Sequence, residues 1–140
     1  MASIRFFSEE INFKLHHPFK TSSWIKLVIQ KEKKTLASLS YIFCSDSHLL
    51  NLNETYLKHS TFTDIITFDF TDHTKEINGE IYISIERVTE NARKFKTSFD
   101  EELHRVIIHG VLHLVGYNDN NSSKKAQIRK KEEAYLSLRS

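Results

Sequence analysis

The sequence has few of the residues that mark disulfide scaffolds and linkers. Its 140 residues include one cysteine, one proline and three glycines. The single cysteine, Cys44, cannot form an internal disulfide, and its apolar neighbourhood YIFCS predicts a small buried hydrophobe. Scarce Pro and Gly argue against long linkers, and the apolar runs are too short to cross a bilayer. The start MASIRFFSEEINF predicts no signal peptide. Together these features predict a cytoplasmic globular protein without a membrane partner.

Length and charge set broad bounds on organisation and partners. A chain of 140 residues predicts one domain, spanning residues 1–140, with a single core. The net charge of +2 permits nucleic acid binding and does not require it. Basic residues cluster at 31–34, 93–96 and 124–131, and the simplest interpretation of each cluster is a solvated helix face or helix end.

Short β-rich runs alternate with helical periodicities along the chain. We predict strands over residues 3–7, 36–44, 64–70 and 79–84, with residues 71–78 as the turn of an antiparallel hairpin. Helices are predicted from Pro18, from Ser45 or Asp46 through Leu57, and over most of the chain after Ser84, with the last helix at 122–138. The expected fold class is therefore α/β, of an α+β-like kind, with a small sheet of about four strands packed on helices.

One helical segment is apolar enough to be central. Ser98 followed three residues later by Glu101 matches the capping box that opens helices. Apolar residues follow at helical spacing, and Gly116 is suited to the turn that ends a helix.

This segment carries the stretch HGVLHLVGYND, residues 109–119. His109 and His113 are four residues apart and so share one face of a helix. If the helix stops at Gly116, the chain can bend and bring Asp119 back towards them. Two imidazoles and a carboxylate suit Zn²⁺, with Fe, Mn or Ni also compatible, and three ligands leave a position open for water. On the residues alone, a histidine pair that only packs or meets solvent remains an alternative.

The same spacing overlays the zinc-peptidase pattern H-E-x-x-H-x-x-G-x-x-H, with two differences. Gly110 stands where the glutamate base would be, and Asp119 stands where the third histidine would be. A phosphodiester needs less from that base than a peptide does, so the glycine favours a nuclease, and we expect that Gly110→Glu will not create a protease. His104 lies roughly 140° around the helix from His109 and is excluded as a ligand. Glu102 shares the face of His109 and is a candidate partner for it.

The stretch 109–119 resembles the signature of the YbeY family of metal-dependent rRNA endoribonucleases, whose usual form is H-G-x-L-H-L-x-G-Y-D-H. Further resemblance spans residues 40–138. It comprises Leu50, Asn51 and Tyr56 (L-N-x-x-Y-R), Thr63, Asp64, Ile65 and Phe68 (P-T-D-V-L-S-F), Gly79-Glu80-Ile81 (G-D-I), and Glu133 in an acidic C-terminal helix.

This resemblance implies that His109, His113 and Asp119 hold one zinc ion per chain and that the metal-bound water is the activated species. It implies a single-strand-specific endoribonuclease that matures the 3′ end of 16S rRNA, acts in ribosome quality control, and has rRNA and the ribosome or its small subunit as partners. Asp119 in place of histidine lowers the charge of the site by one and should weaken the Lewis acid. Leu57 replaces an arginine of the family, so Lys58 is the candidate substrate contact. The resemblance assigns no catalytic side chain.

Two alternatives remain beside the nuclease: a zinc metallopeptidase, and a non-enzymatic ribosome assembly factor with a structural metal. Further RNA-contact candidates, chosen for basic or aromatic character, are Arg93, Lys94, Lys96, Arg105, Tyr56 and Phe62. Tyr117 either lines the site or packs to fix the turn, and His59 is expected in an exposed loop. The sequence pattern indicates no particular oligomeric state.

Overall fold

A computed structural model describes residues 2–58 and 62–139, so His59 lies outside the described residues. Four strands form one sheet in the order β1 (Ser3–Glu9), β2 (Leu36–Cys44), β4 (Ile77–Ser84) and β3 (Ile65–Asp69). The first three strands are parallel to one another, and β3 pairs antiparallel with β4 at the sheet edge.

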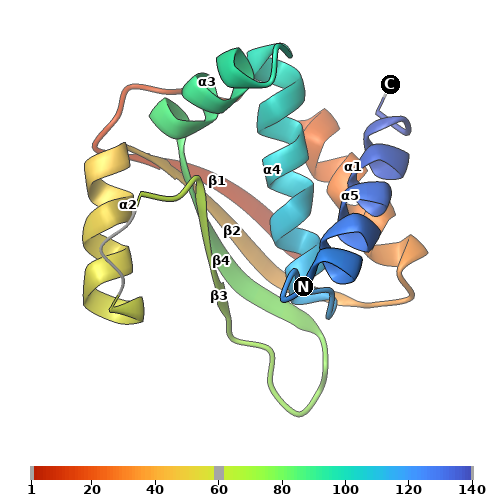
Figure 1. The fold of residues 1–140 in the computed structure, drawn as a ribbon. Helices are drawn as coiled ribbons and strands as arrows, with labels where there is room; N and C mark the ends of the chain where they lie inside the picture. Colours follow the sequence, from red (N-terminus) through yellow and green to blue (C-terminus); the bar gives the residue numbers. More distant parts are fainter. Residues whose placement is uncertain (1, 59–61, 140) are drawn as a thin grey trace.

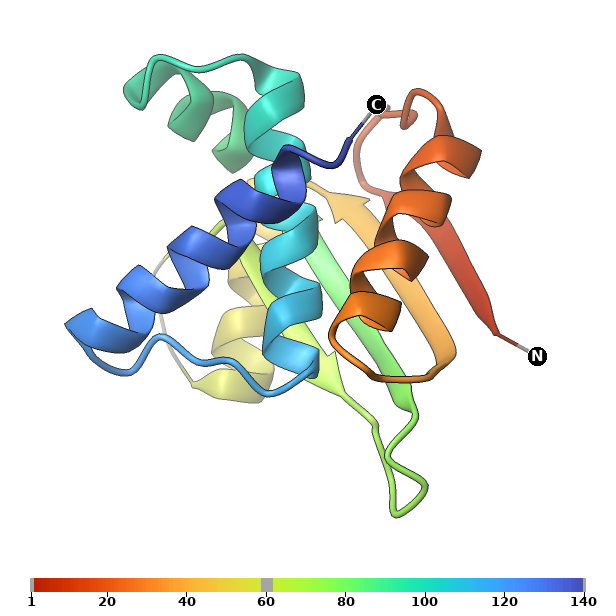
Figure 2. The ribbon, with the colours of Figure 1, turned by 90° about the vertical axis from the view of Figure 1, so that its right-hand side faces the viewer.

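The helices cover the sheet unequally (Figures 1 and 2). They are α1 (Pro18–Lys31), α2 (Asp46–Leu52), α3 (Ile85–Lys94), α4 (Phe99–Leu114) and α5 (Ser122–Leu136). Helices α1 and α4 lie on one face, with α5 against the outer side of α4, and α2 lies on the opposite face. The predicted mixed class, with about four strands and a central α4, is confirmed. No helix in the described part of the chain is long and apolar enough to span a membrane.

Most element boundaries follow the predictions, and the exceptions have tertiary causes. Strand β1 runs two residues beyond the predicted Phe7 because it pairs with β2 as far as Glu9 opposite Cys44. The hairpin is confirmed, although β4 starts at Ile77, whose amide donates to the Thr35 carbonyl (2.7 Å). The helix predicted through Leu57 changes after α2 to a π-helical segment, η1 (Asn53–Leu57). The last helix ends at Leu136 rather than at 138.

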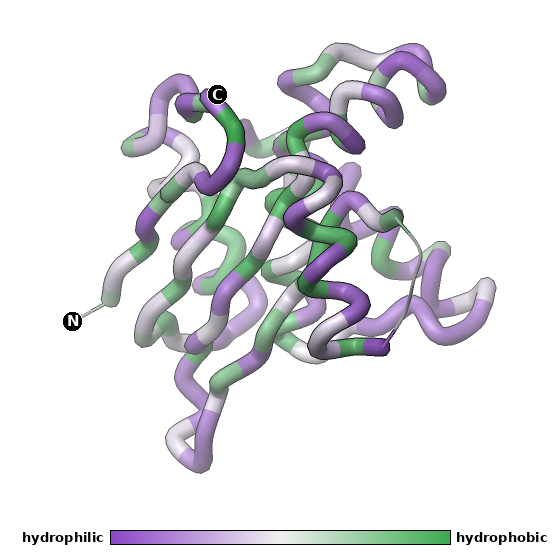
Figure 3. Tube along the Cα trace, turned by 90° about the vertical axis from the view of Figure 1, so that its left-hand side faces the viewer, coloured by the Kyte–Doolittle hydropathy of each residue, from purple (hydrophilic) through white to green (hydrophobic). Residues whose placement is uncertain are grey.

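The core lies between the sheet and helices α1 and α4. Burial alternates along most of β4, as expected of a strand that presents opposite faces in turn, whereas the end of β2, Tyr41 to Cys44, is buried throughout. Figure 3 shows hydrophobic and polar residues interleaved along the sheet. Ile81 and Ile83 of β4 are fully buried, as are Ile107 and Ile108 of α4. The buried Tyr41 hydroxyl of β2 donates a hydrogen bond to the Ile107 carbonyl (2.9 Å). This polar contact fixes α4 on the sheet and so sets the position of the residues that α4 carries.

Cys44 is fully buried, as its sequence neighbourhood predicts, and we expect it to be unreactive. Burial, with the nearby Glu9 and Glu10 carboxylates, raises the pKa of its thiol to about 12. Because the thiolate is the nucleophile, iodoacetamide at about pH 8 should alkylate the native protein at least about 100-fold more slowly than the urea-unfolded protein. Mass spectrometry of timed samples gives both rates. Comparable rates would show that the thiol is accessible in the native state.

Candidate metal centre

Helix α4 has well-defined ends. The Ser98 hydroxyl accepts a hydrogen bond from the Glu101 amide (3.0 Å), as the capping box requires, whereas the Glu101 carboxylate accepts one from the Thr97 hydroxyl (2.5 Å). At the other end Gly116 has φ 116°, a conformation that favours glycine. The amides of Gly116 and Tyr117 donate to the carbonyls of residues 113 (3.1 Å) and 112 (2.9 Å). These two bonds form a Schellman turn and confirm the predicted stop at glycine.

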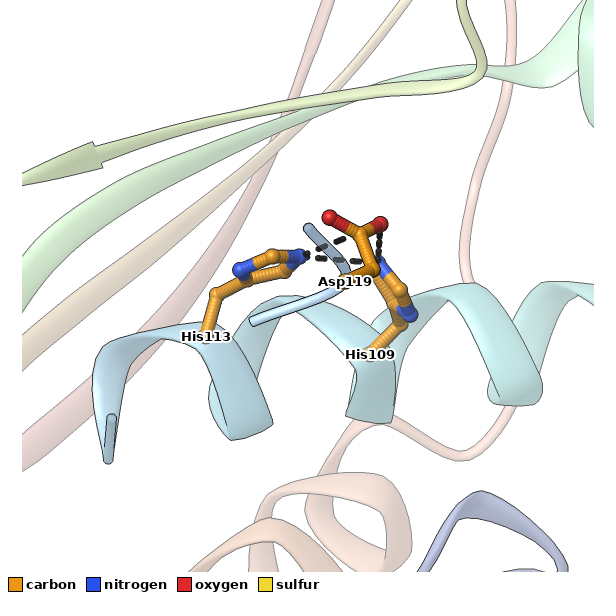
Figure 4. A group of neighbouring side chains, drawn as sticks. All are labelled: His109, His113 and Asp119. Atoms are coloured by element: carbon orange, nitrogen blue, oxygen red, sulfur yellow. Dashed lines mark hydrogen bonds and ion pairs between the residues drawn. The ribbon is translucent and has the colours of Figure 1, made fainter. Parts of the chain in front are cut away.

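This turn brings three potential ligands together. His109 and His113 project from one face of α4, and Asp119 reaches back from the following loop (Figure 4). The two Nε2 atoms lie 3.0 Å apart, and each lies 4.0 Å from Oδ2 of Asp119. Among the described residues these are the three whose donor atoms cluster as metal ligands would. The convergence that the spacing predicts is therefore present in the structure.

The donor set fits a divalent cation. A zinc–nitrogen bond is about 2.1 Å long, so two ligand atoms of one ion lie at most about 4.2 Å apart, and the three distances satisfy this limit. Burial, and then the neighbouring His109, lowers the pKa of His113, which favours the neutral imidazole that a metal requires. The side chains of His109, His113 and Asp119 are 17%, 30% and 45% exposed. The centre is thus open on one side, as a catalytic site requires.

A buried carboxylate lies behind His109. Glu132 of α5 is 2% exposed, and its Oε2 accepts a hydrogen bond from Nδ1 of His109 (2.5 Å). Burial by itself would raise the pKa of Glu132, but the hydrogen bond from His109 and the positive charge of Arg105 lower it below its usual value. Glu102, a candidate partner for His109 from its position on the helix, instead accepts two hydrogen bonds from Arg105. Sequence reasoning missed Glu132, and its nearest signal was the acidic character of the C-terminal helix.

Tyr117 anchors the ligand loop from outside the centre. Its hydroxyl donates to the Glu32 carboxylate (2.9 Å), which also accepts from the Tyr135 hydroxyl and from Nζ of Lys131 (3.3 Å). Burial would raise the pKa of Glu32, but the hydrogen bonds from Tyr135 and Tyr117 lower it below its usual value. Of the two interpretations of Tyr117, packing that fixes the turn agrees with this contact.

Two residues near the motif are occupied elsewhere. His104 is 4% exposed, and its ring bonds the Asp100 carbonyl (2.7 Å) and faces the Thr21 hydroxyl (3.4 Å), which agrees with its exclusion as a ligand. Arg105, proposed as an RNA contact, is instead bound to the carboxylates of Glu102 and Glu132. Its guanidinium therefore holds the carboxylates beside the centre and is not displayed on an open surface for RNA.

A groove adjoins the centre along the edge strand. It is about 370 Å³ in volume and is lined by Leu57, Ile65, Ile66, Thr67, Asp69, His113 and Leu114. Lys58 follows Leu57 in a left-handed conformation (φ 58°) at the end of η1. Tyr56 is exposed, and the exposed Phe62 has the Arg87 guanidinium 5.1 Å from its ring centre. Leu57 lines the groove, and Tyr56 and Lys58 are its neighbours in the sequence.

The remaining basic candidates are not brought to the centre. Arg93 and Lys94 lie in the last turn of α3, and Lys96 follows them. Helix α3 lies at the N-terminal end of α4, whereas His109 and His113 are in the C-terminal half of α4 (Figure 1). These three cations therefore lie away from the metal centre.

Comparison with known sequences gives a consistent result. A family model described as "Endoribonuclease YbeY" matches residues 6–139. A protein of Amoebophilus asiaticus named "Endoribonuclease YbeY" is 50% identical over 135 residues, which cover 96% of this chain and 92% of the relative. Proteins of the same name from Cytophaga hutchinsonii and Flavobacterium psychrophilum are 44% and 47% identical, over 98% and 94% of this chain and 96% and 94% of theirs.

A solved structure shares the fold. The solution structure of a Thermotoga maritima protein aligns with a TM-score of 0.67 and 29% sequence identity. The alignment covers 96% of this chain and 87% of that one. Sequence and structure comparisons therefore extend over nearly the whole chain and include the centre on α4.

Proposed function

The chain belongs to the YbeY endoribonuclease family, and from this premise we propose that it hydrolyses single-stranded RNA with a metal ion held by His109, His113 and Asp119. The observation that carries the proposal is the convergence of three donor atoms at the end of α4, open on one side. The family names favour the nuclease over the metallopeptidase alternative.

The ligand set supports zinc as the metal, with one ion per chain. Two imidazoles and one carboxylate are a common set for catalytic zinc. A divalent cation at this site would polarise a phosphoryl oxygen and lower the pKa of a bound water. Asp119 reduces the net charge of the site by one relative to a third imidazole, so the protein compensates less of the negative charge of a phosphodiester.

The groove beside His113 supports a path for the substrate along β3. Its wall is apolar at Leu57, Ile65 and Leu114, polar at Thr67 and acidic at Asp69. We propose Lys58 as the cation that meets a phosphate at the end of this groove. An ammonium acts there as a point charge and lacks the bidentate geometry of a guanidinium. Substrate orientation therefore depends more on the groove and the metal centre than on a single clamp.

The cellular role follows the family. We propose that residues 1–140 form one domain that acts in the cytoplasm on rRNA, at the 3′ end of 16S rRNA, in association with the ribosome or its small subunit. The same activity would serve in ribosome quality control. Association with small subunits can be tested by sedimentation of the tagged protein with ribosomal fractions.

Metal removal tests the proposed reaction. The zinc-loaded protein should cleave a single-stranded RNA oligonucleotide, a chelator should lower the initial rate by more than about 100-fold, and added Zn²⁺ should restore it. Gel analysis of end-labelled RNA measures the rate. The same oligonucleotide annealed to its complement should be cleaved at least about 10-fold more slowly, because a duplex does not fit a groove for one strand. Chelator-insensitive cleavage would contradict metal dependence. Absence of cleavage by protein that holds one metal per chain would favour the assembly-factor alternative.

A further inference from the structure

We propose that Glu132 is the positioning residue of the metal centre, which holds the His109 ring so that its Nε2 faces His113 and Asp119. This inference rests on the proposed metal-binding function. It assigns to α5, which contributes no ligand, a direct part in metal affinity. The contact joins residues 23 positions apart in the chain.

The hydrogen bond selects one tautomer of His109. A carboxylate can only accept, so Nδ1 of His109 must carry the proton that is shared with Oε2 of Glu132. A neutral imidazole has one proton on its ring nitrogens, and Nε2 is then left with a lone pair. This Nε2 atom lies 3.0 Å from Nε2 of His113 and 4.0 Å from Oδ2 of Asp119. Glu132 therefore directs the ligand atom to the point where the other two donors converge.

Glu132 is itself fixed on its other oxygen. Oε1 accepts a hydrogen bond from Nη1 of Arg105 (3.1 Å) and lies 3.6 Å from Nη1 of Arg129. Arg105 is held in turn by Glu102, through Nε (2.9 Å) and Nη2 (2.6 Å). The Glu132 carboxylate thus has both oxygens engaged and is 2% exposed, so its orientation is set before a metal binds.

The two histidines are supported differently. His113 lies in the last turn of α4, and the Schellman turn at Gly116 follows it directly, so its surroundings come from the same stretch of chain. The support of His109 is a charged side chain from another helix. A carboxylate that accepts a hydrogen bond from an imidazole also makes that imidazole a stronger metal ligand. Loss of the Glu132 charge should therefore act through His109.

Glu132→Gln tests the proposal, with Glu133→Gln as the matched control. The two variants remove the same charge from adjacent positions, and Glu133 is exposed. We expect Glu132→Gln to weaken Zn²⁺ binding about 10- to 100-fold, and Glu133→Gln to change it less than about 2-fold. Competition with a chromogenic chelator measures the affinity, and circular dichroism confirms the fold. Glu132→Asp keeps the charge on a shorter side chain and should bind with intermediate affinity.

A second measurement needs no variant. In the metal-free wild-type protein, long-range proton–nitrogen NMR should report His109 with its proton on Nδ1. A proton on Nε2, or a folded Glu132→Gln variant with wild-type zinc affinity, would overturn the proposal. If wild type binds zinc and cleaves RNA but Glu132→Gln has wild-type zinc affinity, the positioning role fails and the proposed function stands. If wild type binds no metal, both fail together.

Discussion

His113→Ala is expected to abolish RNA cleavage and to leave the protein folded. The variant removes one of two imidazoles whose Nε2 atoms lie 3.0 Å apart and leaves two ligands where three converge. Loss of the metal should lower the cleavage rate by more than about 1,000-fold, which corresponds to about 4 kcal/mol of transition-state stabilisation. The side chain is 30% exposed, so its removal opens no closed cavity in the core. Initial rates on single-stranded RNA, with the metal content per chain, give the result.

The control for this experiment is another histidine. His73 lies exposed in the turn between β3 and β4, and His73→Ala removes the same group at a distance from the centre. It should cleave RNA at the wild-type rate. A folded His113→Ala variant with wild-type cleavage would contradict the ligand assignment. An unfolded variant, with wild type stable only when metal is bound, would support the structural-metal alternative.

Gly110→Glu is expected to prevent stable folding. The variant will therefore not create a protease, even though it places a glutamate where zinc peptidases have their base. A Cβ at Gly110 would lie 2.7 Å from Cδ1 of Ile81, 3.1 Å from Cγ2 of Ile81 and 3.1 Å from Cδ1 of Ile65. These atoms belong to the sheet side of α4, where Ile81 is fully buried. Overpacking together with a buried, unpaired carboxylate should cost more than about 4 kcal/mol.

Gly110→Ala separates packing from charge. Alanine in a helix is ordinarily about 1 kcal/mol more stabilising than glycine. Here we expect the opposite sign, a loss of about 1–3 kcal/mol, because Cγ2 of Ile81 is close to the strand backbone and cannot move far. Urea denaturation measures both variants. Ala126→Glu, on the exposed face of α5, is the control for adding a glutamate to a helix and should change stability by less than about 0.5 kcal/mol.

A Gly110→Glu protein as stable as wild type would contradict this packing, and robust casein cleavage by it would contradict the nuclease interpretation of the centre. The expected instability means that Gly110 is needed for the packing of α4 on the sheet. Because residue 110 has no side chain, α4 lies close to Ile65 of β3 and Ile81 of β4. The same close approach places His113 on the wall of the groove along β3.

Local spacing along the chain is enough to predict several features of the protein. His109 and His113 share a helix face because they are four residues apart, and Gly116 ends that helix because it tolerates positive φ. The return of Asp119 follows from this turn. Alternating and helical periodicities likewise determined the mixed fold class and most element boundaries, since each reflects which face of one segment is buried.

The contacts between segments that are distant in the chain depend on how the helices and strands pack, and local spacing does not predict them. Glu132 binds His109 across 23 residues, and Glu32 binds Tyr117 across 85. Arg105, in sequence a candidate RNA contact, is bound by two carboxylates, one of which comes from α5. The sequence motif shows that Gly110 stands where zinc peptidases have a glutamate base. Its packing against β4 is visible only in the folded structure. Such partners are set by how helices and strands pack, because a side chain's spacing fixes the face it occupies but not the residue that meets it there.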